Sequence, residues 1–146
     1  MKNACFLVSL SFVTSFALGC AGSTPLLTAP SSAGLSAQAV PGLWNLVSMQ
    51  PAGEVEQVKP SGASYTVTFG EGRLSTRVDC NVCTGAFAVS GRTLTVGPAL
   101  ACTRAACPTM AFENAYTSLP EGESTVALSD RTLELSSSRG VLRFTR

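Results

Sequence analysis

Four cysteines lie close together in the second half of the chain: Cys80, Cys83, Cys102 and Cys107. Thiols at these spacings could form two disulfides, hold a zinc ion as a tetrahedral thiolate site, or carry out redox exchange at the Cys-x-x-Cys pair. Redox motifs of this form usually begin a helix, whereas a strand-like run follows Cys83 here. The choice between disulfides and zinc depends on the compartment, because oxidation competes with metal loading outside the cytosol.

Residues 1–19 have the three parts of an export signal. Lys2 supplies a positive charge, an uncharged apolar stretch of about 15 residues follows, and this stretch is too short for a membrane span. The segment Ala17-Leu18-Gly19-Cys20 resembles a bacterial lipobox, so we expect lipidation at Cys20, although the order Ala17-Leu18 departs from the usual pattern. The alternative is cleavage near Gly19, which would release a soluble secreted or periplasmic protein. Export favours two disulfides over zinc or redox chemistry.

The segment after Cys20 is predicted to be a flexible tether over residues 20–40, since it has no charge and no periodicity. Ala21-Gly22-Ser23 contains no Asp that would retain a lipoprotein at the inner membrane, so the periplasmic face of the outer membrane is expected. A single domain then spans residues 41–146. Without Lys2, the 10 basic residues fall to 9 and match the 9 acidic ones. No basic stripe forms, so we exclude nucleic acid as a partner and expect a monomer.

Short alternating segments predict a mainly β fold, α+β at the margin: a small antiparallel β-barrel-like domain of about eight short strands with one helix. Residues 65–69 and 74–78 alternate around Gly70-Glu71-Gly72 and predict a hairpin. A second hairpin is expected over residues 85–96, and three more strands lie between Val126 and Phe144. The helix is expected at about 108–119, where Phe112, Ala115, Tyr116 and Leu119 form one face over the core.

A pattern in the cysteine segment is similar to a known family. Cys80-Asn81 is followed by Gly85, then by Gly97-Pro98-Ala99-Leu100, Thr103-Arg104 and Ala106-Cys107. This pattern resembles the META domain, also called the HslJ-like family, and the resemblance covers residues 41–146. It departs at Ala105, where the family often has Met, and at Cys83 and Cys102, where many members carry apolar residues. The resemblance implies an antiparallel β fold with one helix, in an envelope lipoprotein associated with stress or antibiotic tolerance.

The resemblance also favours one disulfide pairing. Cys80 and Cys107 belong to the family motif, together with Asn81, Gly85, Thr103 and Arg104, so we expect the bonds Cys80–Cys107 and Cys83–Cys102. Nested loops of about 28 and 20 residues stabilise by about 3.6 and 3.3 kcal/mol, against about 2 kcal/mol for a four-residue loop. Sequential and crossed pairings remain alternatives. Nested pairing requires a turn or bulge at Asn81-Val82, because side chains three apart in a strand face opposite ways.

The chain contains no histidine, which removes Ser-His and Cys-His nucleophile pairs and histidine metal sites. The acidic residues are scattered, and Gly70-Glu71-Gly72 is too short for a phosphate-binding loop. Arg104 is expected to donate to carbonyls of its own loop, with capture of an anionic ligand as the alternative. We therefore expect no enzyme, no cofactor and no metal.

The sequence thus predicts a non-catalytic, disulfide-linked envelope domain that acts through binding or structure, with an unidentified envelope protein as a possible partner. The alternative is a carrier or inhibitor that holds a small ligand in or at the mouth of the barrel. A cavity of several hundred cubic ångströms would favour the carrier, and a filled core the interaction module. The side chains expected to decide this are Phe87, Leu94, Phe112 and Tyr116.

Overall fold

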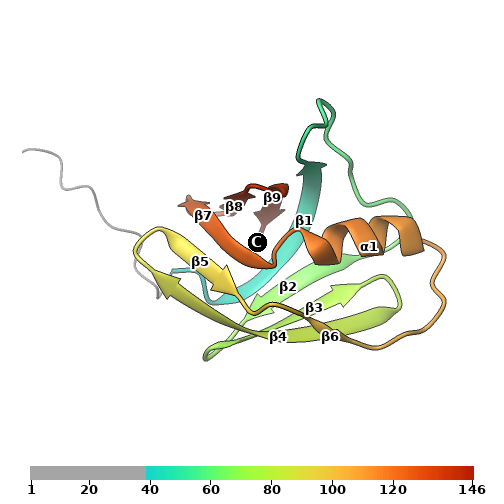
Figure 1. The fold of residues 1–146 in the computed structure, drawn as a ribbon, viewed down its shortest axis with the longest axis horizontal. Helices are drawn as coiled ribbons and strands as arrows, with labels where there is room; N and C mark the ends of the chain where they lie inside the picture. The colour runs from blue at the N-terminus through green and yellow to red at the C-terminus, as the bar shows by residue number, and fades with distance from the viewer. Residues whose placement is uncertain (1–38) are drawn as a thin grey trace, which may run out of the picture. The chain divides into compact units, whose positions relative to one another are not determined.

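The computed structural model of the protein describes residues 39–146, which form nine β-strands and one α-helix (Figure 1). The elements are β1 (Gly42–Pro51), β2 (Tyr65–Phe69), β3 (Arg73–Val78), β4 (Asn81–Ser90), β5 (Thr93–Val96), β6 (Ala101–Cys102), α1 (Met110–Ser118), β7 (Gly122–Leu128), β8 (Thr132–Ser137) and β9 (Gly140–Thr145). Within this part of the chain, no helix is both long and apolar enough to cross a membrane.

Eight of the strands close into an antiparallel barrel. The order is β3-β2-β1-β9-β8-β7-β5-β4, and β4 pairs back onto β3. The short β6 pairs with β4 as an addition to the ring. Closure leaves the eight strands with neighbours on both sides and so removes the free edges of an open sheet. The predicted fold class, a small antiparallel barrel with one helix, is confirmed.

Local sequence explains the hairpins. Tyr65 to Phe69 and Leu74 to Val78 alternate between the core and the outside, and they pair in one unbroken register. Gly72 has a φ of 69° in the turn between them, a conformation that glycine adopts without steric cost. The second predicted hairpin is also present, since Phe87 to Ser90 pair with Thr93 to Val96.

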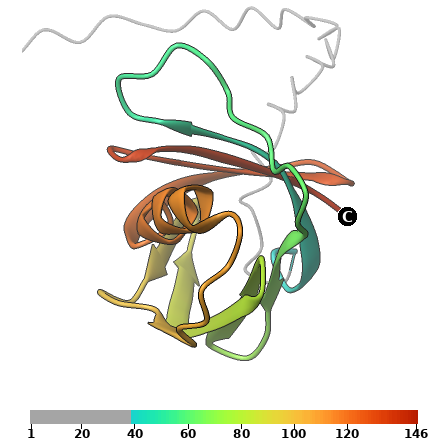
Figure 2. The ribbon, with the colours of Figure 1, turned by 90° about the vertical axis from the view of Figure 1, so that its right-hand side faces the viewer.

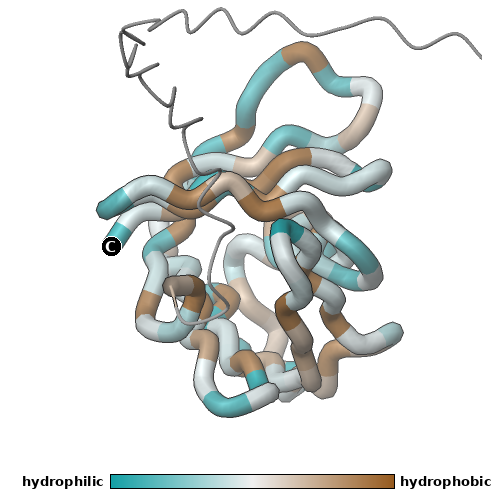
Figure 3. Tube along the Cα trace, turned by 90° about the vertical axis from the view of Figure 1, so that its left-hand side faces the viewer, coloured by the Kyte–Doolittle hydropathy of each residue, from teal (hydrophilic) through white to brown (hydrophobic). Residues whose placement is uncertain are grey.

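The core fills the inside of the barrel. Inward-facing residues alternate with outward ones along the strands, and Figure 3 shows brown hydrophobic positions separated by paler or teal ones. The largest fully buried side chains of the core are Trp44, Tyr116, Leu94, Leu133 and Leu142. The alternation therefore selects which face of each strand is buried.

Helix α1 covers the end of the barrel where β1 and β3 finish and β2 and β4 begin (Figures 1 and 2). Tyr116 and Leu119 are buried, and Phe112 and Ala115 pack partly buried against the core, so the predicted apolar face is confirmed. The helix is shorter than the predicted 108–119 and begins at Met110. Thr109 precedes its first turn, and the backbone N–H of Thr109 is bound by a side chain from outside the helix.

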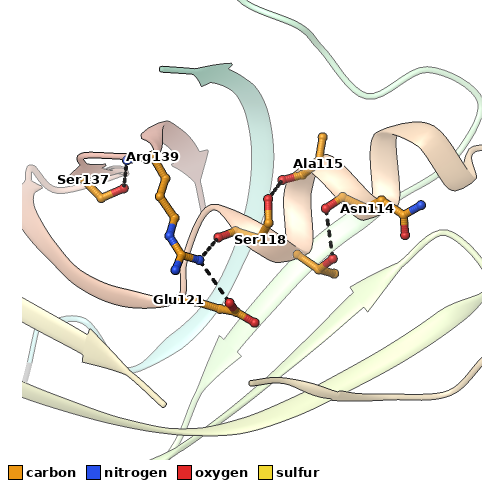
Figure 4. A network of polar contacts seen from close by, with 7 residues as sticks. Asn114, Ala115, Ser118, Glu121, Ser137 and Arg139 are labelled. Atoms are coloured by element: carbon orange, nitrogen blue, oxygen red, sulfur yellow. Dashed lines mark hydrogen bonds and ion pairs between the residues drawn. The ribbon is translucent and has the colours of Figure 1, made fainter. Parts of the chain in front are cut away.

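The C-terminal end of α1 is tied to the turn between β8 and β9 (Figure 4). Nη1 of Arg139 donates to the carbonyl of Ser118 at 2.8 Å and to the carboxylate of Glu121 at 3.0 Å. A positive charge at a helix C-terminus compensates carbonyls that have no partner within the helix. Both ends of α1 are thus held by residues of other elements.

The opposite end of the barrel brings the start of the described chain to its last residue. The carbonyl of Val40 accepts a hydrogen bond from the indole N–H of Trp44 at 2.8 Å. The guanidinium of Arg146 lies 3.9 Å from the centroid of the Trp44 ring and donates to the carbonyl of Ala39 at 2.8 Å. A cation over a Trp face is a favourable contact, so Arg146 helps fix the chain where it joins β1.

Candidate functional site

Two disulfides hold the segment between β6 and α1 against β4. Cys80 is bonded to Cys107 and Cys83 to Cys102, with Cα–Cα distances of 5.7 and 4.0 Å. Cys83 and Cys102 are direct partners in the antiparallel pairing of β4 with β6. The pairing is therefore nested. All four sulfurs are used in it, so none of these cysteines is left as a thiolate for the zinc or redox alternatives.

The turn that makes this pairing possible lies at Asp79-Cys80. The predicted turn or bulge at Asn81-Val82 is wrong, because both residues are already in β4. Asp79 has a φ of 59°, the left-handed conformation that Asp tolerates better than most residues. Cys80 is thereby placed outside the strand while Cys83 lies within it, which lets the two sulfurs reach different points of one segment.

The side chain of Asn81 lies at the centre of a buried hydrogen-bond network. Its Oδ1 accepts from the hydroxyl of Thr103 and from the backbone N–H of Ala105, both at 2.8 Å. Its Nδ2 donates to the carbonyl of Ala105 at 3.0 Å and approaches the Cys107 sulfur at 3.0 Å. Asn81 is only 1% exposed. One amide therefore joins the start of β4 to the whole segment that leads into α1.

Glu113 completes this network, although the sequence analysis did not identify it as a site residue. The Nδ2 of Asn81 donates to its two carboxylate oxygens at 3.0 and 3.2 Å. Glu113 is 6% exposed, and among residues 39–146 it forms no ion pair with a basic side chain. A buried carboxylate without a cation is costly and is uncommon in proteins.

Thr103 and Arg104 have different environments although they are neighbours. The hydroxyl of Thr103 accepts from the backbone N–H of Val82 at 3.0 Å, and the backbone N–H of Thr103 donates to the Val82 carbonyl. The predicted bonds from Arg104 to carbonyls of its own loop are wrong: its guanidinium is exposed and has no hydrogen-bond partner among the described residues. Asn81 already binds the polar backbone groups of Ala105 in this loop, and the Arg104 side chain stays exposed.

A second polar chain fixes the start of α1. The carboxylate of Asp79 accepts from the backbone N–H of Thr109 at 3.0 Å and from its hydroxyl at 2.6 Å. The hydroxyl of Tyr65 lies 2.6 Å from the Thr109 hydroxyl and donates to it, because the Thr109 proton is already directed at Asp79. Burial raises the pKa of Tyr65 above its ordinary value. The neutral phenol is therefore the form that this chain holds.

Gly85 is needed for close packing rather than for chemistry. A Cβ at this position would lie 2.6 Å from Cδ2 of Leu100. The Leu100 side chain crosses β4 at this point, and it lines both the interior and the outer cleft described next. Glycine in a strand often marks such a close approach.

The disulfide-linked segment and α1 enclose a cleft of about 460 Å³ at the mouth of the barrel. Asn81 and Glu113 line it, and so do the apolar side chains of Leu100 and Met110. Arg104 lies in the same lining, so the charged groups of the cleft are one carboxylate and one guanidinium. The cleft is as large as many small-molecule sites.

The interior of the barrel, by contrast, is filled. The space found inside it among residues 39–146 is about 10 Å³, which is at most enough for one water molecule. Leu94 and Tyr116 are fully buried, Phe87 packs on Phe69 with ring centroids 5.0 Å apart, and Phe112 packs on Tyr65 at 4.7 Å. The four side chains expected to decide between a cavity and a core form a core.

The export signal over residues 1–19, the lipidation site at Cys20 and nearly all of the tether over residues 20–40 lie outside the described residues. Their roles stay predictions.

Comparisons with known proteins identify the fold. The model of the META domain family matches residues 37–146. The NMR structure of a protein from Burkholderia xenovorans is similar, with a TM-score of 0.62 and 26% identity, over 75% of this chain and 85% of that one. A second NMR structure has a TM-score of 0.57 and 22% identity, over 74% of this chain and 91% of the other. No curated protein matches the chain.

Proposed function

Because the chain belongs to the META domain family, we propose that it is a non-catalytic, disulfide-linked domain of an envelope lipoprotein that works by binding another envelope component. In this proposal Cys20 carries the lipid and the domain lies on the periplasmic face of the outer membrane. Its physiological role is in tolerance of stress or antibiotics.

The filled barrel is the observation that carries the proposal. A carrier that encloses its ligand requires a cavity of several hundred cubic ångströms, and the interior offers about 10 Å³. The mouth of the barrel is held by two disulfides and by the buried network around Asn81. A rigid domain of this kind presents a preformed surface, which lowers the entropic cost of binding a partner.

Two features support an envelope location. The four paired cysteines suit an oxidising compartment, since cytosolic thiols are kept reduced. The segment over residues 1–20 has the order of a lipoprotein signal, with Lys2, an apolar stretch and Cys20. Two or more acyl chains at Cys20 would anchor the protein stably, since each buried methylene contributes about 0.8 kcal/mol.

The side-chain chemistry supports a non-catalytic role. The sequence has no histidine, and the buried carboxylate, Glu113, is held by Asn81 rather than by a second acid or a nucleophile. Acid–base catalysis by carboxylates normally uses a pair of them placed across the reacting bond. The buried polar groups of this site instead link β4, the disulfide segment and α1.

The test is expression of the full chain in a diderm bacterium, with a C-terminal affinity tag and a Cys20→Ser control. The intact mass of the purified protein should show acylation for the wild type and none for the variant. Membrane fractionation should place the wild type in the outer membrane. Recovery of unmodified wild-type protein from the soluble periplasm would contradict the lipoprotein assignment.

The binding role is tested separately, by crosslinking in intact cells before purification from the envelope. The wild type should recover the same envelope component in replicate experiments, and cells without the gene should be more sensitive to envelope stress or antibiotics. Complementation by the wild type should restore tolerance. Failure to recover any component, together with unchanged tolerance, would contradict the proposed function.

A further inference from the structure

We propose that the cleft at the mouth of the barrel binds a small zwitterionic ligand of the amino-acid type, with its ammonium group on Glu113 and its carboxylate on Arg104. The inference goes beyond the role proposed above and depends neither on lipid attachment nor on a protein partner. It rests on the burial, the hydrogen bonds and the charges of the cleft.

The carboxylate of Glu113 can accept a further hydrogen bond. It is 6% exposed, its carboxylate oxygens accept from the amide of Asn81, and it lines the cleft. Each carboxylate oxygen can accept more than one hydrogen bond. An amide compensates a buried negative charge less well than a cation does, so the site retains capacity for a positively charged donor.

Glu113 is held in place before any ligand arrives. Asn81 is itself fixed from the other side, because its Oδ1 accepts from Thr103 and from the backbone of Ala105. The disulfide Cys80–Cys107 closes the same segment covalently. A carboxylate with a fixed orientation loses little conformational entropy when it binds.

The cleft carries one charge of each sign. Arg104 and Glu113 are the charged residues of the cleft, and they do not pair with each other. A simple cation would be attracted by Glu113 but repelled by Arg104. A simple anion would be attracted by Arg104 but repelled by Glu113. A ligand with both charges satisfies both groups. Guanidinium is also the side chain best suited to hold a carboxylate through two hydrogen bonds.

Part of the cleft lining is apolar and can contact an apolar part of the ligand. Leu100 and Met110 belong to the cleft lining, and Met110 is 39% exposed. A free volume of about 460 Å³ has room for an aliphatic side chain beside these residues. Methionine adapts to ligands of different shape. An amino acid with a branched apolar side chain is therefore a suitable probe.

The experiment titrates the oxidised full-length protein, in detergent, with three probes and follows amide signals by NMR. L-leucine carries both charges, L-leucinamide only the ammonium group, and N-acetyl-L-leucine only the carboxylate. We expect L-leucine to bind with a Kd of about 1 mM, L-leucinamide about tenfold more weakly, and N-acetyl-L-leucine not measurably. The shifted signals should come from Asn81, Thr103 and Glu113. Equal binding of all three probes, or no shift at these residues, would overturn the proposal.

Two variants assign the charges. Glu113→Gln keeps the shape and an acceptor for Asn81, and it should abolish binding of both L-leucine and L-leucinamide. Arg104→Gln should weaken L-leucine about tenfold and should not weaken L-leucinamide, because Arg104 repels the ammonium group. Glu123→Gln, at an exposed position of β7, is the matched control and should bind as the wild type does. If Arg104→Gln weakens L-leucinamide as much as L-leucine, Arg104 does not act on the ligand carboxylate and the proposal is wrong. The three-probe comparison on the wild type remains decisive if Glu113→Gln does not fold.

Discussion

Asn81 donates its side-chain amide to both carboxylate oxygens of Glu113, at 3.0 and 3.2 Å, across the junction between β4 and α1. The two residues are 32 positions apart in the sequence, and both are buried. The contact fixes the position of the helix relative to the barrel, and it shapes the floor of the cleft. The Asn81 side chain therefore contributes both to the stability of the mouth of the barrel and to the ability of the cleft to bind a ligand.

Removal of the Asn81 side chain should destabilise the oxidised protein strongly. Asn81→Ala removes this partner from the buried Glu113 carboxylate and from the part-buried backbone N–H of Ala105. Each such group costs about 1–3 kcal/mol, so we expect the free energy of unfolding to fall by about 3 kcal/mol in urea denaturation. Asn45→Ala is the control, because Asn45 is exposed and makes one long hydrogen bond of 3.5 Å. Equal effects of the two substitutions would contradict a central role for Asn81.

The two disulfides should contribute similar amounts to stability. Replacing Cys83 and Cys102 by Ala opens a loop of about 20 residues, and replacing Cys80 and Cys107 opens one of about 28, so we expect losses of about 3.3 and 3.6 kcal/mol. Thermal unfolding of the oxidised variants measures both, and reduction of the wild type should lower its Tm. A titration under denaturing conditions should find no free thiol among these four cysteines. Two or more would show that the bonds do not form in the protein.

Stability should fall in alkaline solution because of Tyr116. Burial raises the pKa of Tyr116 to about 12, from 10.0, although its hydrogen bond with Thr76 partly opposes the shift. The unfolded chain releases the phenol proton first as the pH rises, so the stabilisation is fully present below pH 10 and is lost progressively up to about pH 12. A displacement of about two pKa units corresponds to about 3 kcal/mol at most.

Urea denaturation at a series of pH values between 9 and 11 measures this effect. Tyr116→Phe is the matched variant. It should be less stable at neutral pH, because Thr76 loses a partner in the core, but its stability should decline less steeply with pH. If the free energy of unfolding of Tyr116→Phe declines with pH as steeply as that of the wild type, a group other than Tyr116 causes the alkaline loss of stability. The pKa of Tyr65 is also raised, so the free energy of unfolding should still decline slightly with pH in both the wild type and the variant.

Gly85→Ala should disturb the wall of the cleft. The added methyl group would lie 2.6 Å from Cδ2 of Leu100, so the Leu100 side chain must move. Overpacking of this kind costs about 1–3 kcal/mol, and thermal unfolding should show it. Gly70→Ala is the control, because its Cβ would meet only the Arg73 carbonyl at an ordinary 3.6 Å. If Leu100→Ala restores most of the loss in the double variant, the close approach is the cause; an additive double variant would exclude it.

The parts of the fold that sequence reasoning found are those with local causes. The hairpin from Tyr65 to Val78 is encoded by alternation on both sides of a glycine turn, and the face of α1 by the spacing of Phe112, Ala115, Tyr116 and Leu119. The fold class and the family followed from these elements and from the cysteine motif. The two wrong predictions have different causes. The turn lies at Asp79-Cys80 because Asp79 adopts a φ of 59°. The loop that contains Arg104 is held by Asn81, which is distant in the sequence.

Glu113 shows why the site was harder to predict than the fold. An acid in the first turn of a helix is typical of an exposed position, and the local sequence carries no sign that Glu113 is buried. Its partner Asn81 lies 32 positions away in the sequence and is brought next to it by the folded barrel. The residue pattern named Asn81 as important through the family resemblance, but its partner could be found only in three dimensions.

The contact between Arg146 and Ala39 has a consequence for how the molecule is presented. The described part of the chain begins beside its last residue at one end of the barrel, whereas α1 and the cleft lie at the other end. A molecule attached through its C-terminus to a bead or a sensor chip therefore directs Glu113 and Arg104 toward the bulk solution. Attachment at the C-terminus leaves the cleft open, and attachment at α1 would block it.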